Sequence, residues 1–182
     1  MFIREATAQD YSHIARLHAE NWQHIYRGIL GDDYLQQRVI DDHLAIWQTR
    51  LTHPCFTQGI LVVEEDEQIR GFVSIYGNHI FKEGTCFEQG TLIDSLHIDL
   101  KYRGKGYGKA LLAAAAKWAG KYFSDYGLYL EVAEGNKPAE QFYQALSGKN
   151  DGDVIWKTPC GTEVVCHKYI WTTPQQLLQA AN

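Results

Sequence analysis

The feature of the sequence that most constrains the fold is a glycine-rich junction between an apolar run and an amphipathic run. The apolar run TLIDSLHI ends at Ile98, and the stretch DLKYRGKGYGKALL, residues 99–112, follows it. The first run indicates a strand, and the spacing after the junction indicates one face of a helix. Such a junction requires a sheet with a helix packed against it. The expected buried face of this helix comprises Leu111, Leu112, Ala115, Trp118, Ala119 and Tyr122.

The charges of this junction indicate an anion site. Four cations, Lys101, Arg103, Lys105 and Lys109, lie among three glycines in a chain whose formal net charge is −5. The first N–H groups of a helix have no partner within the helix, and with the helix dipole they favour a phosphate. A short charge run is more often a solvated face, and glycines also form plain tight turns. The flanking strand and helix favour the phosphate interpretation.

Two familiar phosphate-binding motifs do not fit this stretch. A P-loop requires GxxxxGK[ST], but Lys109 stands where the second glycine should be. A dinucleotide-binding GxGxxG also fails, because its third glycine would fall on Lys109 or on Leu111. The pattern that remains is Arg103-x-x-Gly106-x-Gly108.

The other segments predict an α+β domain with one central sheet. We expect a mixed, mostly antiparallel sheet of about seven strands with helices beside it, in a single domain over residues 1–182. Besides TLIDSLHI, the expected strands are FIREA, the two halves of the hairpin GILVVEEDEQIRGFVSIYG, LYLEVA, and segments near 153–157 and 164–171. Helices are expected from Thr7–Asp10 to near Asn21, over 32–52 with a break near residue 40, after the glycine junction, after Asn136, and at PQQLLQAA.

Composition excludes several classes of protein. A net charge of −5 argues against nucleic-acid binding, which normally needs a basic face. The longest apolar run, Ala110–Ala116, is too short to cross a membrane, and the N-terminus has no apolar targeting segment, so we expect a cytoplasmic protein. The four cysteines show neither CxxC pairing nor zinc-like spacing with histidine, which predicts reduced thiols and no metal site.

The ordered motifs resemble the GNAT superfamily of acyl-CoA-dependent N-acetyltransferases. The pattern Arg103-x-x-Gly106-x-Gly108 resembles the cofactor motif of that family, and residues 1–51 and 92–122 resemble its opening segment and core. In residues 128–146, Asn136 precedes Pro138-Ala139 and Phe142-Tyr143 with the family's spacing. The chain departs from the family at Leu100, where relatives often have proline, and at LSGKND after Tyr143, where they have Gly-Phe.

The resemblance implies that acetyl-CoA is bound as a cosubstrate, without a metal. By likeness to the family, the pantetheine arm pairs with the backbone of the strand that ends at Ile98, and backbone amides of the glycine junction hold the pyrophosphate. The implied cofactor-binding residues are Leu96, His97, Ile98, Arg103, Gly104, Lys105, Gly106, Tyr107, Gly108, Lys109 and Asn136. Asn136 also has a plain alternative as a helix cap.

The reaction requires two groups that move protons. A protonated amine must lose a proton before it attacks, and the departing thiolate must gain one. Tyr143 matches the family's general acid, although beside Phe142 it could also be a core residue. For the base we predict Asp94, because strand periodicity places it on one face with Leu92, Leu96 and Ile98, where a carboxylate is costly to bury without a role. A structural ion pair is its alternative, and His97 and Glu131 are competing bases.

The predicted function is N-acetyl transfer from acetyl-CoA to a primary amine of a small molecule or peptide, by direct attack within a ternary complex. The alternatives are a non-catalytic acyl-CoA-binding or regulatory module and a site for another nucleotide phosphate. The resemblance also suggests a homodimer, and it places the segment around Trp22 and Tyr26 at the border of the acceptor pocket. The sequence leaves the identity of the amine open.

Overall fold

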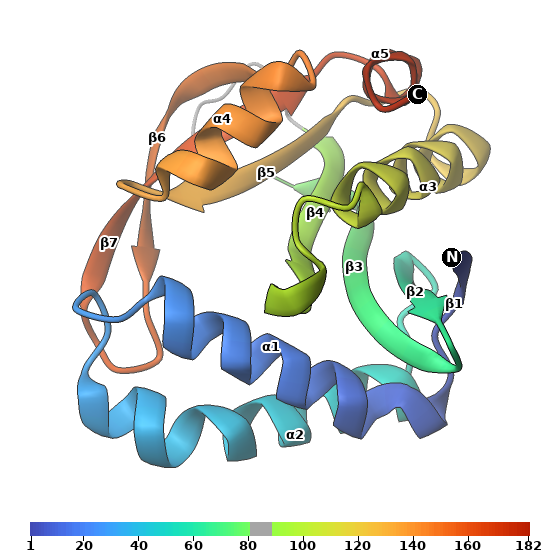
Figure 1. Cartoon of the computed structure of the whole chain (residues 1–182). Coiled ribbons are helices and arrows are strands. Elements are labelled where there is room, and N and C mark those ends of the chain that lie inside the picture. Colours follow the sequence, from blue (N-terminus) through green and yellow to red (C-terminus); the bar gives the residue numbers. More distant parts are fainter. Residues whose placement is uncertain (81–88) are drawn as a thin grey trace.

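The computed structural model describes residues 1–80 and 89–182 and arranges seven strands in the order β1-β2-β3-β4-β5-β7-β6 (Figure 1). The strands are β1 (Phe2–Glu5), β2 (Gln58–Glu65), β3 (Gln68–Ile80), β4 (Gln89–Ile98), β5 (Leu128–Ala133), β6 (Lys149–Lys157) and β7 (Glu163–Trp171). The helices are α1 (Tyr11–Ile25), α2 (Val39–Thr52), α3 (Tyr107–Tyr122), α4 (Lys137–Ala145) and α5 (Pro174–Ala180). Strands β4 and β5 pair in parallel, and the other pairs are antiparallel. The α+β class and the mixed sheet are confirmed.

Helices cover both faces of the sheet (Figure 1). On one face, α1 and α2 pack on β2 and β3 through a core that includes Ile14, Trp47 and Phe72. On the other face, α3 and α5 pack on the sheet through a core that includes Leu111 and Leu177. Burial of these apolar side chains stabilises the domain and holds the ends of β4 and β5 in a fixed place between the two layers.

The helices differ from the sequence prediction at three places. Helix α1 continues past Asn21 to Ile25. The break expected near residue 40 is a π-helical turn, η2 (Tyr34–Arg38), that leads directly into α2. On α3, Leu111, Leu112, Ala115 and Ala119 are buried as expected, whereas Tyr122 is 52% exposed because it lies in the last turn. Cys86 lies outside the described residues.

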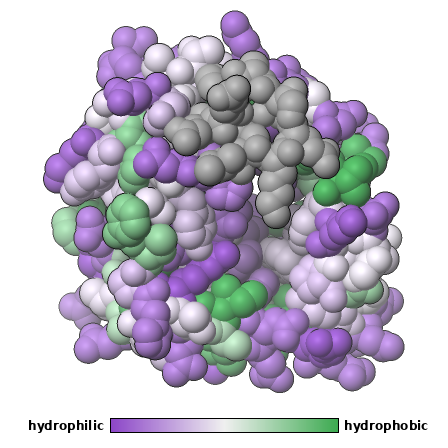
Figure 2. Space-filling view, turned by 180° about the vertical axis from the view of Figure 1, so that it is seen from behind, coloured by the Kyte–Doolittle hydropathy of each residue, from purple (hydrophilic) through white to green (hydrophobic). Residues whose placement is uncertain are grey.

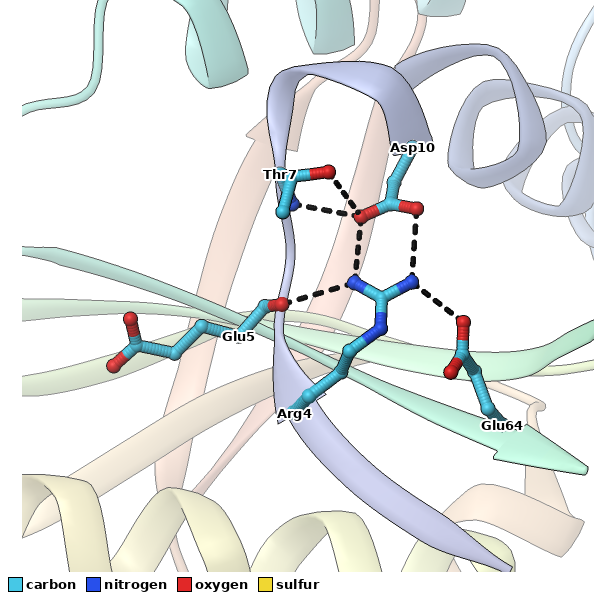
Figure 3. Close-up of polar contacts among 5 residues, drawn as sticks. All are labelled: Arg4, Glu5, Thr7, Asp10 and Glu64. Atoms are coloured by element: carbon cyan, nitrogen blue, oxygen red, sulfur yellow. Dashed lines mark hydrogen bonds and ion pairs between the residues drawn. The ribbon is translucent and has the colours of Figure 1, made fainter. Parts of the chain in front are cut away.

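An ion-pair network fixes β1 to the start of α1 (Figure 3). The guanidinium of Arg4 donates to both carboxylate oxygens of Asp10, at 2.7 and 3.0 Å, and to Oε1 of Glu64 on β2, at 2.5 Å. The Asp10 carboxylate also accepts from the backbone N–H of Thr7, at 2.7 Å, which satisfies a donor at the helix start. Charge-assisted hydrogen bonds that are partly buried are stronger than those at the surface.

Asp10→Asn is expected to lower the free energy of unfolding by about 2 kcal/mol at pH 7, because Arg4 loses its charged acceptor. The hydrogen bond from Arg4 lowers the pKa of the Asp10 carboxyl below its usual value. The folded state therefore favours the carboxylate, and this stability is present above about pH 4 and is lost as the pH falls towards the folded-state pKa. Urea unfolding at pH 7 and at pH 3 measures both effects. Asp125→Asn, at an exposed carboxylate, is the control. If the difference in unfolding free energy between Asp10→Asn and the wild type were as large at pH 3 as at pH 7, this account would be contradicted.

The surface seen in Figure 2 is largely hydrophilic, and its hydrophobic side chains form small separate groups. Groups of this size are usual on a protein surface. No helix in residues 1–80 and 89–182 is long and apolar enough to cross a membrane.

Candidate active site

The site forms where β4 and β5 separate. Their pairing is limited to Thr91 with Leu128 and Leu92 with Tyr129, after which the two strands diverge. A cavity of about 790 Å³ opens at this divergence and extends from the end of α1 to the start of α3 and to α4. This volume is in the range of a small-molecule or cofactor site.

A β-bulge lies at the divergence and changes the direction of the predicted base. In the pairing of β3 with β4, Ser74 is opposite Ser95 and Ile75 is opposite Ile93, so Asp94 is an extra residue with no partner. Because of the bulge, Ile93 and Leu96 pack in the same core. The expectation that Asp94 alternates with Leu96 and Ile98 on one face is therefore wrong. Asp94 is exposed and lines the cavity instead.

The glycine junction adopts the conformation of an anion-binding loop. Gly104 and Gly106 have φ values of +76° and +86°, which residues with side chains rarely adopt, and Gly106 is the N-cap of α3. A Cβ at either glycine would meet no heavy atom within 4 Å, so the backbone is open to a ligand. The first N–H groups of α3, which has sixteen residues, have no acceptor within the helix. The junction can therefore donate to a phosphate.

Side chains on both sides of the junction fix its position. The carboxylate of Asp99 accepts from the N–H of Lys101 at 3.0 Å, and the Arg70 guanidinium lies 4.2 Å from the centre of the Tyr102 ring. Lys105 also lies over the Tyr102 ring, with Nζ 4.3 Å from its centre. Its side chain does not line the cavity, unlike the other predicted cofactor residues.

Asn21 connects the junction to α1. Its Oδ1 accepts a hydrogen bond from Nη2 of Arg103, and its Nδ2 donates to the carbonyl of Leu17 at 2.9 Å and to that of Ile98 at 3.2 Å. Asn21 is 1% exposed, so these bonds satisfy a buried amide. No sequence pattern gives Asn21 this role, because Ile98 and Arg103 are distant from it in the chain.

Helix α4 places Tyr143 against the cavity. Asn136 is the N-cap of this helix, and its Oδ1 accepts from the N–H of Ala139 at 3.4 Å, so its role as a cap is real. Asn136 also lines the cavity. The Tyr143 ring is 8% exposed, with the ring of Trp171 6.2 Å away. Burial raises the pKa of the Tyr143 phenol, so the hydroxyl is protonated at neutral pH.

The first three residues of the segment LSGKND, Leu146–Gly148, form a tight turn between α4 and β6. Ser147 has a φ of +61°, and the N–H of Gly148 donates to the carbonyl of Tyr143 at 2.9 Å. A Cβ at Gly148 would lie 2.9 Å from the Trp171 ring, so only glycine fits there. Strand β6 begins directly afterwards, at Lys149. Although the family's Gly-Phe is absent at this point, Tyr143 still lines the cavity.

The predicted base and its competitors differ in their surroundings. The carboxylate of Asp94 accepts from Nη1 of Arg50 at 2.8 Å and from Oγ of Ser95 at 3.0 Å, so it is in an ion pair. The ring of His97 lies 4.4 Å from that of His18, and burial lowers the pKa of His97 to about 3, which makes it a weak base. Glu131 of β5 is exposed and lines the cavity.

A cluster of aromatic side chains lies beside the cavity near the end of α1. Tyr26 lines the cavity, and its ring is 5.1 Å from that of Trp22 and 5.4 Å from that of Trp156 on β6. That the segment around Trp22 and Tyr26 borders the acceptor pocket stays a prediction. Trp156 was not expected there, because no sequence pattern relates β6 to α1.

The structure thus brings together a loop suited to phosphate, an opened strand edge, a buried phenol and two carboxylates around one cavity. Tyr143, Asp94 and the predicted cofactor residues other than Lys105 line it. Within the described residues, no group of three or more His, Cys, Asp or Glu side chains could hold a metal ion. This combination makes the cavity the candidate active site.

Comparison with known proteins identifies the family to which the chain belongs. The model of the Acetyltransferase (GNAT) family matches residues 16–148, well over half of the chain. The chain therefore belongs to the GNAT acetyltransferase family, as the resemblance of its motifs suggested. An uncharacterized N-acetyltransferase, YuaI of Bacillus subtilis (strain 168), is 29% identical over 147 residues, covering 80% of this chain and 78% of YuaI.

Solved structures share the fold at low sequence identity. A GCN5-related N-acetyltransferase from Rhodopseudomonas palustris superposes with a TM-score of 0.72 at 16% identity, covering 94% of each chain. The structure of yncA from Salmonella typhimurium, solved with its cofactor acetyl-CoA, superposes with a TM-score of 0.66 at 18% identity, covering 94% of this chain and 93% of yncA.

Proposed function

We propose that the protein transfers the acetyl group of acetyl-CoA to a primary amine of a small molecule or peptide, by direct attack in a ternary complex. The observation that supports this most is one cavity that joins the N-terminus of α3, the opened edge of β4 and Tyr143. The complex of yncA with acetyl-CoA gives the proposed donor further support. A cytoplasmic location and a homodimer stay predictions of the sequence.

Cofactor binding would use two parts of the backbone. The amides from Arg103 to Lys109 would donate to the pyrophosphate, aided by the dipole of α3. Beyond Leu92, the edge of β4 that faces β5 is not paired with it. Backbone groups of Leu96–Ile98 would therefore be available for the amides of the pantetheine arm. The carbonyl of Ile98 already accepts from Asn21.

The chemistry would use Tyr143 and a carboxylate of the sheet. Tyr143 would protonate the sulfur as the thioester bond breaks, and its buried phenol suits this because it is protonated at neutral pH. The proton of the acceptor amine would go to Asp94, the predicted base, or to its competitor Glu131. A backbone N–H near the bulge could polarise the thioester carbonyl, and such a donor contributes about 3 kcal/mol in other enzymes.

A thiol-release assay with acetyl-CoA and a panel of primary amines tests this function. We expect amine-dependent release of coenzyme A together with formation of the N-acetyl product. Binding of acetyl-CoA without release of thiol for any amine would instead indicate a non-catalytic acyl-CoA-binding module. Thermal stabilisation by ATP or NAD, without stabilisation by coenzyme A, would exclude the proposed donor.

A further inference from the structure

The β-bulge of β4 lies where neither neighbouring strand holds it. Strand β4 pairs with β5 only at Thr91 and Leu92, two residues before the bulge. On the β3 side, Ile93 and Ser95 pair with successive residues of β3, so Asp94 between them has no partner. A bulge interrupts the ladder of backbone hydrogen bonds and bends the strand locally. The backbone at Asp94, which lines the cavity, therefore depends on other contacts for a fixed position.

The Asp94 carboxylate makes such contacts. Nη1 of Arg50 on α2 donates to Oδ2 of Asp94 at 2.8 Å, and Oγ of Ser95 donates to the same oxygen at 3.0 Å. The side chains of Arg50 and Asp94 are each 26% exposed, so the ion pair is partly shielded from water and is screened less than a pair at the open surface. The ion pair joins the bulge to a helix that packs on one face of the sheet.

Two aromatic rings hold Arg50 in place. Its guanidinium lies 5.0 Å from the centre of the Trp47 ring, one turn earlier on α2, and 5.5 Å from that of the Tyr76 ring on β3. A guanidinium at such distances is attracted to the face of the ring. Nε1 of Trp47 donates to Nδ1 of His18 at 3.0 Å. The Tyr76 hydroxyl accepts from Nε2 of Gln58 at 2.6 Å. Because both rings are fixed by their own hydrogen bonds, Arg50 presents a fixed cation to the bulge.

We infer that Arg50 is a positioning residue of the proposed reaction, which fixes the bulge of β4 beside the thioester through its ion pair with Asp94. The inference rests on the proposed transferase function, in which a backbone N–H near the bulge polarises the thioester carbonyl. A displacement of about 1 Å at such a group can lower the rate about 100-fold. The sequence leaves two alternatives for Asp94, and the inference favours the ion pair over the role of base.

Asp94→Asn distinguishes the two alternatives. The amide oxygen of asparagine can still accept a hydrogen bond from Arg50, but asparagine cannot act as a base at neutral pH. If Asp94 anchors the bulge, kcat in the thiol-release assay should stay within about fivefold of the wild type, because a neutral acceptor keeps about half the strength of a charged one. The acidic limb of the pH profile should also remain. Loss of that limb would make Asp94 the base and would overturn the inference.

Arg50→Met tests the positioning residue itself, because methionine keeps an unbranched apolar stem and removes the cation. We expect kcat to fall at least about tenfold and the Kd of acetyl-CoA to stay within about twofold. Arg16→Met, at an exposed arginine of α1, is the control and should keep the wild-type kcat. An unchanged kcat in Arg50→Met would overturn the inference.

A double variant tests whether Arg50 acts through Asp94. Asp94→Ala removes the same ion pair from its other side, so it should lower kcat as much as Arg50→Met does. The two substitutions together should lower kcat no further than either one alone, since both remove a single contact. Losses that multiply in the double variant would show that the two residues act independently, and would overturn the inference.

Hydrogen exchange separates this inference from the proposed function. If no amine releases thiol, the transferase function fails, and the exchange rates of the backbone amides of residues 93–96, measured by NMR without cofactor, then test the anchor alone. Arg50→Met should raise these rates at least about tenfold, whereas Arg16→Met should leave them unchanged. Equal rates in Arg50→Met and the wild type would overturn the positioning role, whatever the result of the activity assay.

Discussion

Tyr143→Phe should lower kcat about 100-fold and leave the Kd of acetyl-CoA within about twofold, because the change removes only the proton donor for the sulfur. The ring lies in the core beside Phe142 and Trp171, and phenylalanine keeps its packing. Thiol release under saturating amine and acetyl-CoA measures the change in kcat, and calorimetry measures the change in Kd.

Tyr169→Phe is the matched control for this experiment. Tyr169 is buried, its ring is 6.2 Å from that of Tyr143, and its hydroxyl accepts from Nε2 of Gln144 at 3.0 Å. Loss of this hydroxyl should affect stability more than kcat. Full activity of Tyr143→Phe, or an equal loss of kcat in the two variants, would remove Tyr143 from its role as general acid.

Gly106→Glu should weaken acetyl-CoA binding at least about 100-fold, which corresponds to about 3 kcal/mol. The substitution forces a side chain onto a residue with a φ of +86° and places a carboxylate at the N-terminus of α3, where it competes with the phosphate. Calorimetric titration of the variant with acetyl-CoA measures the loss of affinity.

Gly161→Glu controls for backbone strain in this experiment. Gly161 has a φ of +84°, and a Cβ there also meets nothing within 4 Å, but it lies in the turn between β6 and β7. The control should therefore lose stability to a similar degree and keep its affinity for acetyl-CoA. Similar losses of affinity in both variants would show that the Gly106 result is caused by strain and not by the anion site.

The sequence was sufficient to predict the sheet, most helices and the glycine junction, because each has a local signal. Alternating or continuous apolar runs marked the strands, and Thr7, Asn136 and the glycines marked helix starts. The prediction for Tyr143 depended on the family resemblance and not on a local pattern. Helical spacing alone suggested a core residue, and only its position after Asn136 related it to a family of enzymes. In the structure the ring is buried and also lines the cavity. Its role as general acid stays a prediction.

The parts of the site that depend on contacts across the chain could not be predicted. Alternation along β4 placed Asp94 with Leu96 and Ile98, but one extra residue in the strand turns it towards α2. A bulge adds a residue without any change of composition, so periodicity cannot detect it. The ion pair with Arg50 and the hydrogen bond between Asn21 and Arg103 have no sequence signal either, since their partners are 44 and 82 residues apart.

The most direct test of the account is a calorimetric comparison of acetyl-CoA with S-acetylpantetheine, which has the same thioester arm without the diphosphate. If backbone amides at the start of α3 hold the pyrophosphate, acetyl-CoA should bind at least about 100-fold more tightly than S-acetylpantetheine. Equal affinities, or no heat on titration with acetyl-CoA, would contradict the assignment of the glycine junction as the cofactor site.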